Sequence, residues 1–324
     1  MNAVILAGGF GSRLKGLTEN LPKPMLSVAN APMIDYAVSH LWDFKIRDFV
    51  FTLNYKPEDI IEWCIGYHGA TCRFSLESEP LGTLGGVKAV EDFLHDIFIV
   101  VSGDVIENIN FDAMLNKHLN SGADITMAVA EVDDVFGFGV PQIDAWGKVI
   151  DFKEKQGVKG LAGLVNTGVY MINKSVLARI PKDVKLDFAV DLLPVLAADG
   201  KLHSYTHDGY WQDAGTLERY YNVNFNLMGG GFYFKAPNKF RVLNREMGGN
   251  LVASTAFVEG QIEGCIVGDG AYVESGAVLT DCIVLPKVRA SSKHFNAIVG
   301  RGSVLGVQRE GYIKHGAEDF GYML

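Results

Sequence analysis

The residues best suited to chemistry stand near the start of the chain, in a glycine cluster followed by two separated cations. Residues 8–14 read GGFGSRL, and Lys23 lies between Pro22 and Pro24. Glycines that follow a strand let backbone N–H groups approach a phosphate or a base closely, because no Cβ intervenes. Arg13 offers a planar fork for phosphate oxygens, and Lys23 offers a point charge on a stiffened backbone. Together these residues indicate a phosphate-binding loop.

This cluster matches neither of two common phosphate-binding patterns. Arg13 and Leu14 stand near where the last glycine of G-x-G-x-x-G would be, and no G-K-[ST] follows as in a P-loop. The alternative for the two cations is an ordinary pair of solvated surface charges.

The elements that must position this loop alternate between strand-like and helical segments. We expect strands at 3–7, 48–54, 72–78 and 97–104, and near 124–132, 148–154 and 164–172, with helical patterns at 33–42, 58–67 and 84–94. Such alternation predicts an α/β fold with a Rossmann-like, mostly parallel sheet and helices on both faces. Ligands then bind at the carboxyl ends of the strands, where the glycine cluster lies.

A change of periodicity marks the C-terminal part. A helix from about Leu217 to Met228 ends in glycines, and residues 265–287 then align in sixes as CIVGDG, AYVESG, AVLTD and CIVLPK. A six-residue repeat predicts a parallel β-helix, and this one resembles short left-handed hexapeptide β-helices. We therefore divide the chain into residues 1–235 and 236–324. Cys265 and Cys282, one coil apart, are interpreted as stacked small core residues.

Composition excludes several classes of protein. The chain has 324 residues, of which 48% are hydrophobic, enough for about two domains. A net charge of −9 argues against nucleic acid or an anionic membrane as partner. The four scattered cysteines are typical of a reduced compartment, and neither a signal peptide nor a run of 18 apolar residues is found. We expect a cytoplasmic protein.

Motifs along nearly the whole chain resemble the sugar-1-phosphate nucleotidyltransferase family. Its signature, G-G-x-G-[ST]-R-L-x-x-L-T-x-x-x-P-K-P, is present at residues 8–24, with Lys15-Gly16 where Arg-Pro is common. Members make an NDP-sugar and pyrophosphate from an NTP and a sugar 1-phosphate with Mg²⁺, and many carry a C-terminal left-handed β-helix. The resemblance implies this reaction, with residues 1–235 as the catalytic domain.

The implied reaction joins two anions, so it requires positioning and charge neutralisation. The resemblance makes Arg13 and Lys23 catalytic, with Arg13 at the leaving pyrophosphate and Lys23 at the reacting centre. Mg²⁺ requires hard oxygen ligands. The family motifs G-D and W-x-D-x-G-T place these at Asp104 and Asp213, although each aspartate alone could also be a turn former or a helix cap.

The resemblance also implies a sugar-phosphate site and a nucleotide site. In the former, Glu154 would accept hydrogen bonds from sugar hydroxyls and Lys155 would meet the phosphate, although Gln156 stands where the family has proline. The remaining sugar-phosphate residues are Gly139, in FGFGV, and Asn166, in NTGVY. The nucleotide-binding residues are Leu6, Ala7, Gly8, Gly9, Glu77, Pro80, Gly82 and Thr83.

Glu77 is the residue that bears on the choice of base. Relatives that use UTP or dTTP often have glutamine there, whereas a carboxylate is acceptor-only. Guanine presents two adjacent donors and suits this carboxylate, so GTP is favoured. Two alternatives remain. Glu77 faces solvent, or a water between Glu77 and the base exchanges the pattern of donors and acceptors that the base meets.

A GTP-using member of the family with this two-domain layout resembles the mannose-1-phosphate guanylyltransferases. The expected function is therefore the synthesis of GDP-mannose from GTP and mannose 1-phosphate. Alternatives are glucose-1-phosphate thymidylyl- or uridylyltransferase, heptose-1-phosphate guanylyltransferase, and a regulatory NDP-sugar-binding relative. A more distant one is an acyltransferase with His294 or His315 as base. We expect a homo-oligomer formed through the β-helix.

Overall fold

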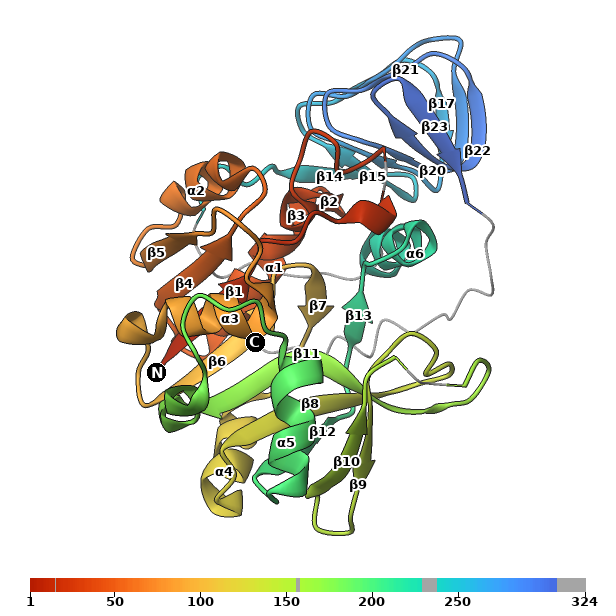
Figure 1. Cartoon of the computed structure of the whole chain (residues 1–324). Coiled ribbons are helices and arrows are strands. Elements are labelled where there is room, and N and C mark those ends of the chain that lie inside the picture. The colour runs from red at the N-terminus through yellow and green to blue at the C-terminus, as the bar shows by residue number, and fades with distance from the viewer. Residues whose placement is uncertain (15, 156–157, 229–237, 308–324) are drawn as a thin grey trace.

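The structure is a computed structural model that describes residues 1–14, 16–155, 158–228 and 238–307. Lys15, Gln156, His315 and the expected domain boundary at 235/236 lie outside the described residues. Figure 1 shows a central sheet flanked by helices, followed by a stack of short strands formed by the C-terminal part of the chain. No helix within the described ranges has the length and apolarity that crossing a bilayer demands.

A seven-stranded sheet, in the order β12-β8-β11-β6-β1-β4-β5, forms the centre of the molecule. β11 runs antiparallel to both of its neighbours, whereas the other neighbouring strands are parallel. The expected mostly parallel sheet is confirmed. The strands are β1 (Asn2–Leu6), β4 (Asp48–Leu53), β5 (Thr71–Leu76), β6 (Ile97–Ser102), β8 (Ile125–Val132), β11 (Gly163–Asn173) and β12 (Leu202–His207).

Two hydrophobic cores lie on opposite faces of this sheet, because successive strand residues point to opposite sides. Along β1, Ala3 and Ile5 join the first core and Val4 joins the second. The first core is covered by α1 (Met33–Asp43), α2 (Pro57–Ile65) and α4 (Phe111–Ser121). The second is covered by α3 (Gly82–Ala89) and α5 (Leu193–Ala198). Helices on both faces are thus confirmed.

Two elements differ from the sequence prediction. The helix expected at 84–94 ends at Ala89, and a 3₁₀ turn follows at Glu91–Phe93. The buried side chain of Asn2 explains the break, because it donates to Phe93 O at 2.8 Å and accepts from His95 N at 3.2 Å. The strand expected near 148–154 is β10 (Val149–Lys153), which pairs with β9 (Val140–Ile143) outside the central sheet.

Helix α4 was missing from the prediction although its boundaries carry clear signals. Asn110 caps its N-terminus, where the side-chain oxygen accepts from Ala113 N at 3.0 Å. Gly122 ends it with φ 63°, a left-handed conformation that favours glycine. Phe111, Met114 and His118 are its buried residues.

Most of the C-terminal strands stack in parallel with matching registers, whereas the first and the last strand of the stack pair antiparallel with their neighbours. Leu251, Ile266, Ile283 and Ile298 occupy equivalent positions in β15, β18, β20 and β22. A second set of equivalent residues is Phe257, Tyr272 and Arg289. The bounds are β14 (Asn244–Met247), β15 (Asn250–Ala253), β16 (Phe257–Val258), β17 (Gln261–Glu263), β18 (Ile266–Val267), β19 (Tyr272–Val273), β20 (Val278–Val284), β21 (Arg289–Ala290), β22 (Lys293–Gly300) and β23 (Ser303–Gly306).

The register steps between equivalent residues are shorter than three full six-residue units, and a sharp corner occurs in each step. Gly264, Asp281 and Asn296 each precede an equivalent inward residue, and each has a left-handed φ, between 47° and 58°. Cys265 and Cys282 follow the first two corners. Both are free and buried, and Cys282 N lies 3.4 Å from Cys265 Sγ. The interpretation of the two cysteines as stacked core residues is confirmed.

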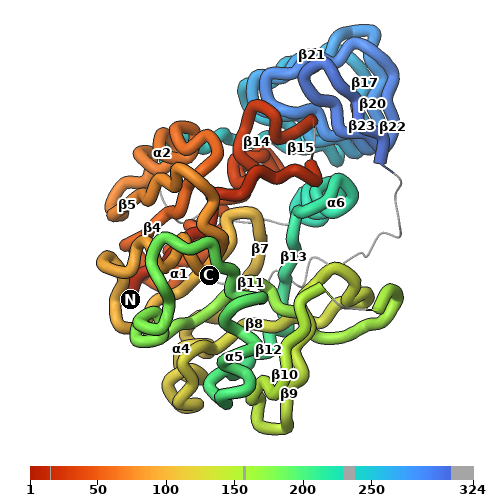
Figure 2. Tube along the Cα trace, in the orientation of Figure 1, coloured from red at the N-terminus to blue at the C-terminus, as the bar shows by residue number. Residues whose placement is uncertain are grey.

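The C-terminal strands pack on the segment that carries the two predicted cations. A third core joins Leu14, Leu17 and Leu26 to Ile266 and Ile283. Tyr220 and Tyr221 of α6 (Leu217–Met228) belong to the same core. Figures 1 and 2 show α6 and the segment before α1 lying beside the stacked strands. The glycine loop is therefore supported by residues far away in the sequence.

A buried ion pair fastens the start of the C-terminal part to α1. Asp35 is fully buried, and Arg241 binds it through Nε and Nη2, both at 2.7 Å. The hydroxyl of Tyr67 also donates to Asp35. Such a carboxylate is costly to bury without its partner.

Replacing Arg241 should therefore destabilise the fold strongly. We expect Arg241→Met to cost about 3–5 kcal/mol, because Asp35 is left buried without a counter-charge. Arg301→Met, at an exposed turn residue, is the control and should change stability by about 0.5 kcal/mol or less. Denaturant unfolding measures both variants, and equal midpoints for the two would contradict the structural role of the pair.

Candidate active site

The predicted site residues gather at the carboxyl ends of four parallel strands. Gly8 follows β1, Glu77 follows β5 and Asp104 follows β6, and a Cβ on Gly8 would contact Asn54, just after β4. Ala7 N donates to Thr52 O at 3.1 Å, and Gly103 N donates to Leu6 O at 2.9 Å. These bonds keep the predicted nucleotide-binding segment from Leu6 to Gly9 beside its neighbouring strands.

A short antiparallel ribbon brings the two predicted metal ligands together. β7 (Val105–Glu107) directly follows Asp104, and β13 (Trp211–Asp213) ends with Asp213. Their register pairs Asp213 with Val105. Two carboxylates that lie far apart in the sequence therefore become neighbours.

Lys23 lies between these carboxylates. Its Nζ forms an ion pair with Asp104 and lies 3.4 Å from Asp213 Oδ1. Its side chain is only 8% exposed. Burial raises the pKa of Asp104, but the charge of Lys23 and hydrogen bonds from Lys23 and Ser102 outweigh it and lower that pKa below its ordinary value. Asp104 is thus an ionised acceptor.

Arg13 approaches the same centre from the glycine loop. A Cβ on Gly215 would lie 2.7 Å from Asp213 Oδ2 and 3.2 Å from Arg13 Nη2. Gly215 therefore leaves room for both side chains. Gly11 has φ +62°, and a Cβ there would come within 3.0 Å of Lys23 Cβ. Glycine is thus required at position 11, where a side chain would meet Lys23, and at position 215, where it would meet Asp213 and Arg13.

Glu77 is neither solvent-facing nor free. It is half-buried, and its Oε2 accepts from Leu81 N at 3.0 Å across the turn that contains Pro80. Burial raises the pKa of Glu77, and the bond from Leu81 opposes that shift. A Cβ on Gly86 would lie 2.6 Å from Glu77 Oε1, so a larger residue there would displace the carboxylate.

Gly82 and Thr83 contact a distant segment rather than open space. Gly82 has φ +74°, and a Cβ there would lie 2.4 Å from Leu186 O. Thr83 Oγ1 donates to Asp187 Oδ1 at 2.7 Å. These contacts hold the loop to residues 186–188. The nucleotide-binding role of Gly82 and Thr83 stays a prediction.

The four predicted sugar-phosphate residues lie together. Asn166 N donates to Gly139 O at 2.8 Å, and a Cβ on Gly139 would lie 2.7 Å from Glu154 Oε2. Lys155 Nζ is 3.5 Å from Glu154 Oε1, but its side chain is 70% exposed. A bulge in β11 between Asn166 and Tyr170 interrupts the ladder at this point.

Comparison with known proteins identifies the family. A match to the family described as Nucleotidyl transferase spans residues 2–228. The chain is 33% identical to "Probable mannose-1-phosphate guanylyltransferase 3" of Oryza sativa subsp. japonica, over 94% of this chain and 88% of that protein. This chain belongs to the nucleotidyl transferase family. It is a sugar-1-phosphate nucleotidyltransferase, as the motifs implied.

Other relatives agree with this assignment. The nucleotidyltransferase is 35% identical to "Mannose-1-phosphate guanyltransferase" of Schizosaccharomyces pombe, over 68% of this chain and 62% of that protein. A crystal structure of HddC from Yersinia pseudotuberculosis matches with a TM-score of 0.61 and 31% identity, over 69% of this chain and 97% of that one. HddC complexed with GMP-PN matches with a TM-score of 0.60.

Three side chains of the nucleotidyltransferase site were missed by sequence reasoning. Arg219 Nη1 lies 3.1 Å from Asp213 Oδ2, Asp187 binds Thr83, and Tyr170 OH accepts from Asn166 Nδ2 at 2.7 Å. Arg219 and Tyr170 stand within a few residues of recognised motifs, so motif proximity could have drawn attention to them. Asp187 carries no such signal.

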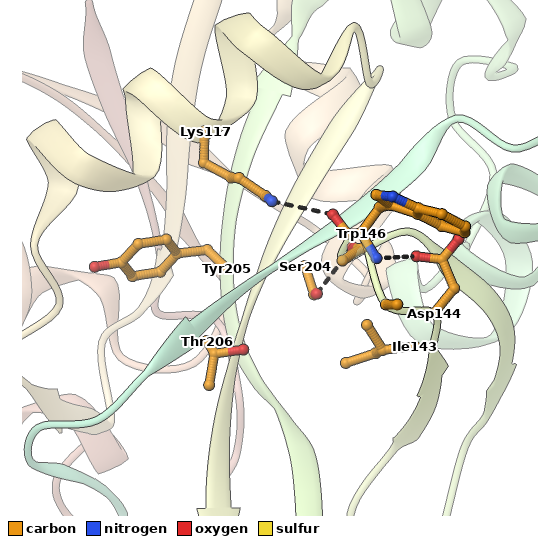
Figure 3. A pocket seen from close by; sticks show the side chains of 9 residues that line it. Lys117, Ile143, Asp144, Trp146, Ser204, Tyr205 and Thr206 are labelled. Carbon is orange, nitrogen blue, oxygen red and sulfur yellow. Dashed lines mark hydrogen bonds between the residues drawn. The ribbon is translucent and has the colours of Figure 1, made fainter.

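A pocket of about 390 Å³ lies apart from the candidate active-site residues, between α4, β12 and the turn that joins β9 to β10 (Figure 3). Lys117 Nζ donates to Trp146 O at 3.2 Å, and Ser204 Oγ donates to Gly147 O at 2.9 Å. These bonds fasten the turn to its neighbours. No predicted site residue lines this pocket.

The carboxylate ribbon is anchored to α1 by a buried pair. His40 Nδ1 and Glu107 Oε1 are 2.8 Å apart, and Glu107 lies in β7. Burial lowers the pKa of His40, but the charge of Glu107 and its hydrogen bond to His40 outweigh that effect. The pKa of His40 is therefore raised above its ordinary value. The folded state therefore binds this proton more tightly than the unfolded state.

Stability should consequently depend on pH through His40. The contribution of the charged pair is fully present below pH 6.5 and is lost as pH rises through the higher folded-state pKa. We expect the stability difference between wild type and His40→Asn to be larger at pH 6 than at pH 9. Denaturant unfolding at both pH values measures it, and a difference independent of pH would refute the charged pair.

Proposed function

We propose that this chain makes GDP-mannose and pyrophosphate from GTP and mannose 1-phosphate. Its similarity to proteins named mannose-1-phosphate guanylyltransferase extends over nearly the full chain and supports this function. The neighbouring HddC structure, solved with a ligand named GMP-PN, supports a guanine nucleotide.

The charges of the site fit the reaction. Lys23 lies 3.4 Å from Asp213, and the guanidinium of Arg13 lies beside Gly215. There the two cations would neutralise the α-, β- and γ-phosphates. The carboxylates of Asp104 and Asp213 share Lys23, so both point to one small region, and hard oxygens of this kind suit Mg²⁺ alongside substrate phosphates. Bound there, Mg²⁺ would stabilise charge on the α-phosphate. Lys23, which lies at the same place, would bind phosphate oxygens of the substrates.

The base is proposed to be read by Glu77. Its half-buried carboxylate, fixed by Leu81 N, offers acceptors to the adjacent N1–H and N2–H donors of guanine. Uracil and thymine present one donor between two acceptors, and those acceptors would be repelled by the carboxylate of Glu77. The backbone of Leu6, Ala7, Gly8 and Gly9 would contact the nucleotide, and Gly9 has open space where a Cβ would lie.

The sugar is proposed to bind between β11 and β10. Glu154 would accept from sugar hydroxyls, and Asn166 would orient the ring together with Tyr170. Burial raises the pKa of Tyr170, against the hydrogen bond from Asn166, and the charges of Glu154 and Asp187 add to the rise. The neutral hydroxyl accepts from Asn166 and keeps a proton to donate to the sugar.

We further infer a two-domain organisation. Residues 1–235 would form the catalytic domain, and residues 236–324 would form a left-handed β-helix. The parallel registers of the stacked strands support a β-helix. We infer that copies of the chain assemble through this part, where Phe257 and Phe295 are 70% and 61% exposed. Location in the cytoplasm stays a prediction.

A substrate matrix tests the function. Pyrophosphate release is measured with Mg²⁺ for each of GTP, ATP, UTP and dTTP, each paired with mannose, glucose and heptose 1-phosphates. We expect the highest kcat/KM for GTP with mannose 1-phosphate. Relative to the pyrimidine nucleotides, we expect a gain of about tenfold or more, equivalent to about 1–3 kcal/mol at Glu77. A preference for UTP or dTTP would overturn the argument from Glu77, and a preference for another sugar would replace mannose.

A further inference from the structure

Arg219 occupies the junction between the carboxylate centre and the sugar-phosphate loop. It lies in the first turns of α6, and its Nη1 is 3.1 Å from Asp213 Oδ2. Its guanidinium carbon lies 4.3 Å from the ring centroid of Phe138. Phe138 immediately precedes Gly139, and its carbonyl accepts from Lys155 N at 3.1 Å. One side chain thus contacts both halves of the site.

The guanidinium is held in place but retains binding capacity. Phe138 itself packs against Trp211, with ring centroids 5.6 Å apart, and Trp211 Nε1 donates to Thr167 O at 3.2 Å. Stacking on an aromatic face orients a guanidinium without using its N–H groups. Asp213 is its hydrogen-bond partner within the described ranges, and a guanidinium has five N–H donors. The side chain is 32% exposed, so donors remain for a ligand.

We propose that Arg219 binds the phosphate of the sugar 1-phosphate substrate, the group that attacks the nucleotide. This proposal rests on the function proposed above. The attacking phosphate must lie between the carboxylate centre and the sugar, which is where Arg219 lies. A guanidinium can bind two phosphate oxygens at once, and this fixes the direction of attack.

The cation expected for this task from the sequence was Lys155. Its side chain is 70% exposed, it has φ 51°, and its ionic partner is the adjacent Glu154. A flexible ammonium in water contributes little to a fixed geometry. Arg219, stacked and ion-paired, is better preorganised, so it carries most of the binding of this phosphate and Lys155 carries less.

Kinetics of Arg219→Gln and Arg219→Lys test the proposal. With GTP saturating, KM for mannose 1-phosphate should rise about ten- to a hundredfold in Arg219→Gln, because a charge-assisted contact is lost. Arg219→Lys keeps the charge but not the fork, so its KM should rise less. Phe138→Leu should also raise this KM, since the guanidinium loses its platform. KM for GTP should stay within about twofold in all three.

Arg179→Gln is the matched control. Arg179 forms exposed ion pairs with Asp124 and Asp199 at the opposite end of β8 and should leave every constant unchanged. An unchanged KM for mannose 1-phosphate in Arg219→Gln and Arg219→Lys overturns the proposal. So does a variant whose defect is a higher Mg²⁺ requirement alone, because that places the role of Arg219 in positioning Asp213.

Direct binding separates this proposal from the proposed function. Calorimetric titration with mannose 1-phosphate and with glucose 1-phosphate, without turnover, should show weaker binding to Arg219→Gln than to wild type or Arg179→Gln. Equal affinities overturn the role of Arg219. If the wild type is inactive in the substrate matrix but binds the sugar phosphate more tightly than Arg219→Gln does, the proposed reaction is refuted. The role of Arg219 in binding the sugar phosphate is then still supported. Melting temperatures establish that each variant is folded, and Phe138→Leu provides the test if Arg219→Gln is not.

Discussion

Lys23 holds two carboxylates together, and the rest of the site is arranged around that contact. Two like charges 4 Å apart repel by about 4 kcal/mol at an effective dielectric near 20, so Asp104 and Asp213 need a cation between them. In the structure, the ammonium of Lys23 supplies it. Asp104 and Asp213 would hold a divalent metal together with substrate phosphates, and Lys23 would bind phosphate oxygens beside them. The same charge that stabilises the free protein would then serve the reaction.

Support for this contact comes from three separate parts of the chain. The β7–β13 ribbon places the carboxylates side by side, and His40 ties that ribbon to α1. The third core packs the segment around Leu14 and Leu26 against α6 and the stacked C-terminal strands. The C-terminal strands therefore stabilise the loop that carries the cations, although the proposed catalytic residues all lie outside them. A chain without these strands would expose the apolar surface beneath that loop.

Much of the candidate site could be predicted from the sequence because its residues stand within short motifs. Lys23, Asp104 and Asp213, taken from three separate motifs, do lie together in the structure. Local pattern could not show that Glu77 binds Leu81 N or that Thr83 binds Asp187, because these contacts depend on how loops fold onto each other. The same limit applies to Arg219, which becomes part of the site only when α6 lies over Phe138. In the C-terminal part, the six-residue pattern indicated stacked strands, but it could not show that the register steps are shorter than three full units.

The most direct test of the account is the position of the metal ion. Crystals grown with Mn²⁺ and a non-hydrolysable GTP analogue would locate the ion by its anomalous scattering. We expect one peak at about 2 Å from oxygens of both Asp104 and Asp213, with Lys23 Nζ on a phosphate oxygen. A peak remote from these carboxylates, with Lys23 still bridging them, would contradict it.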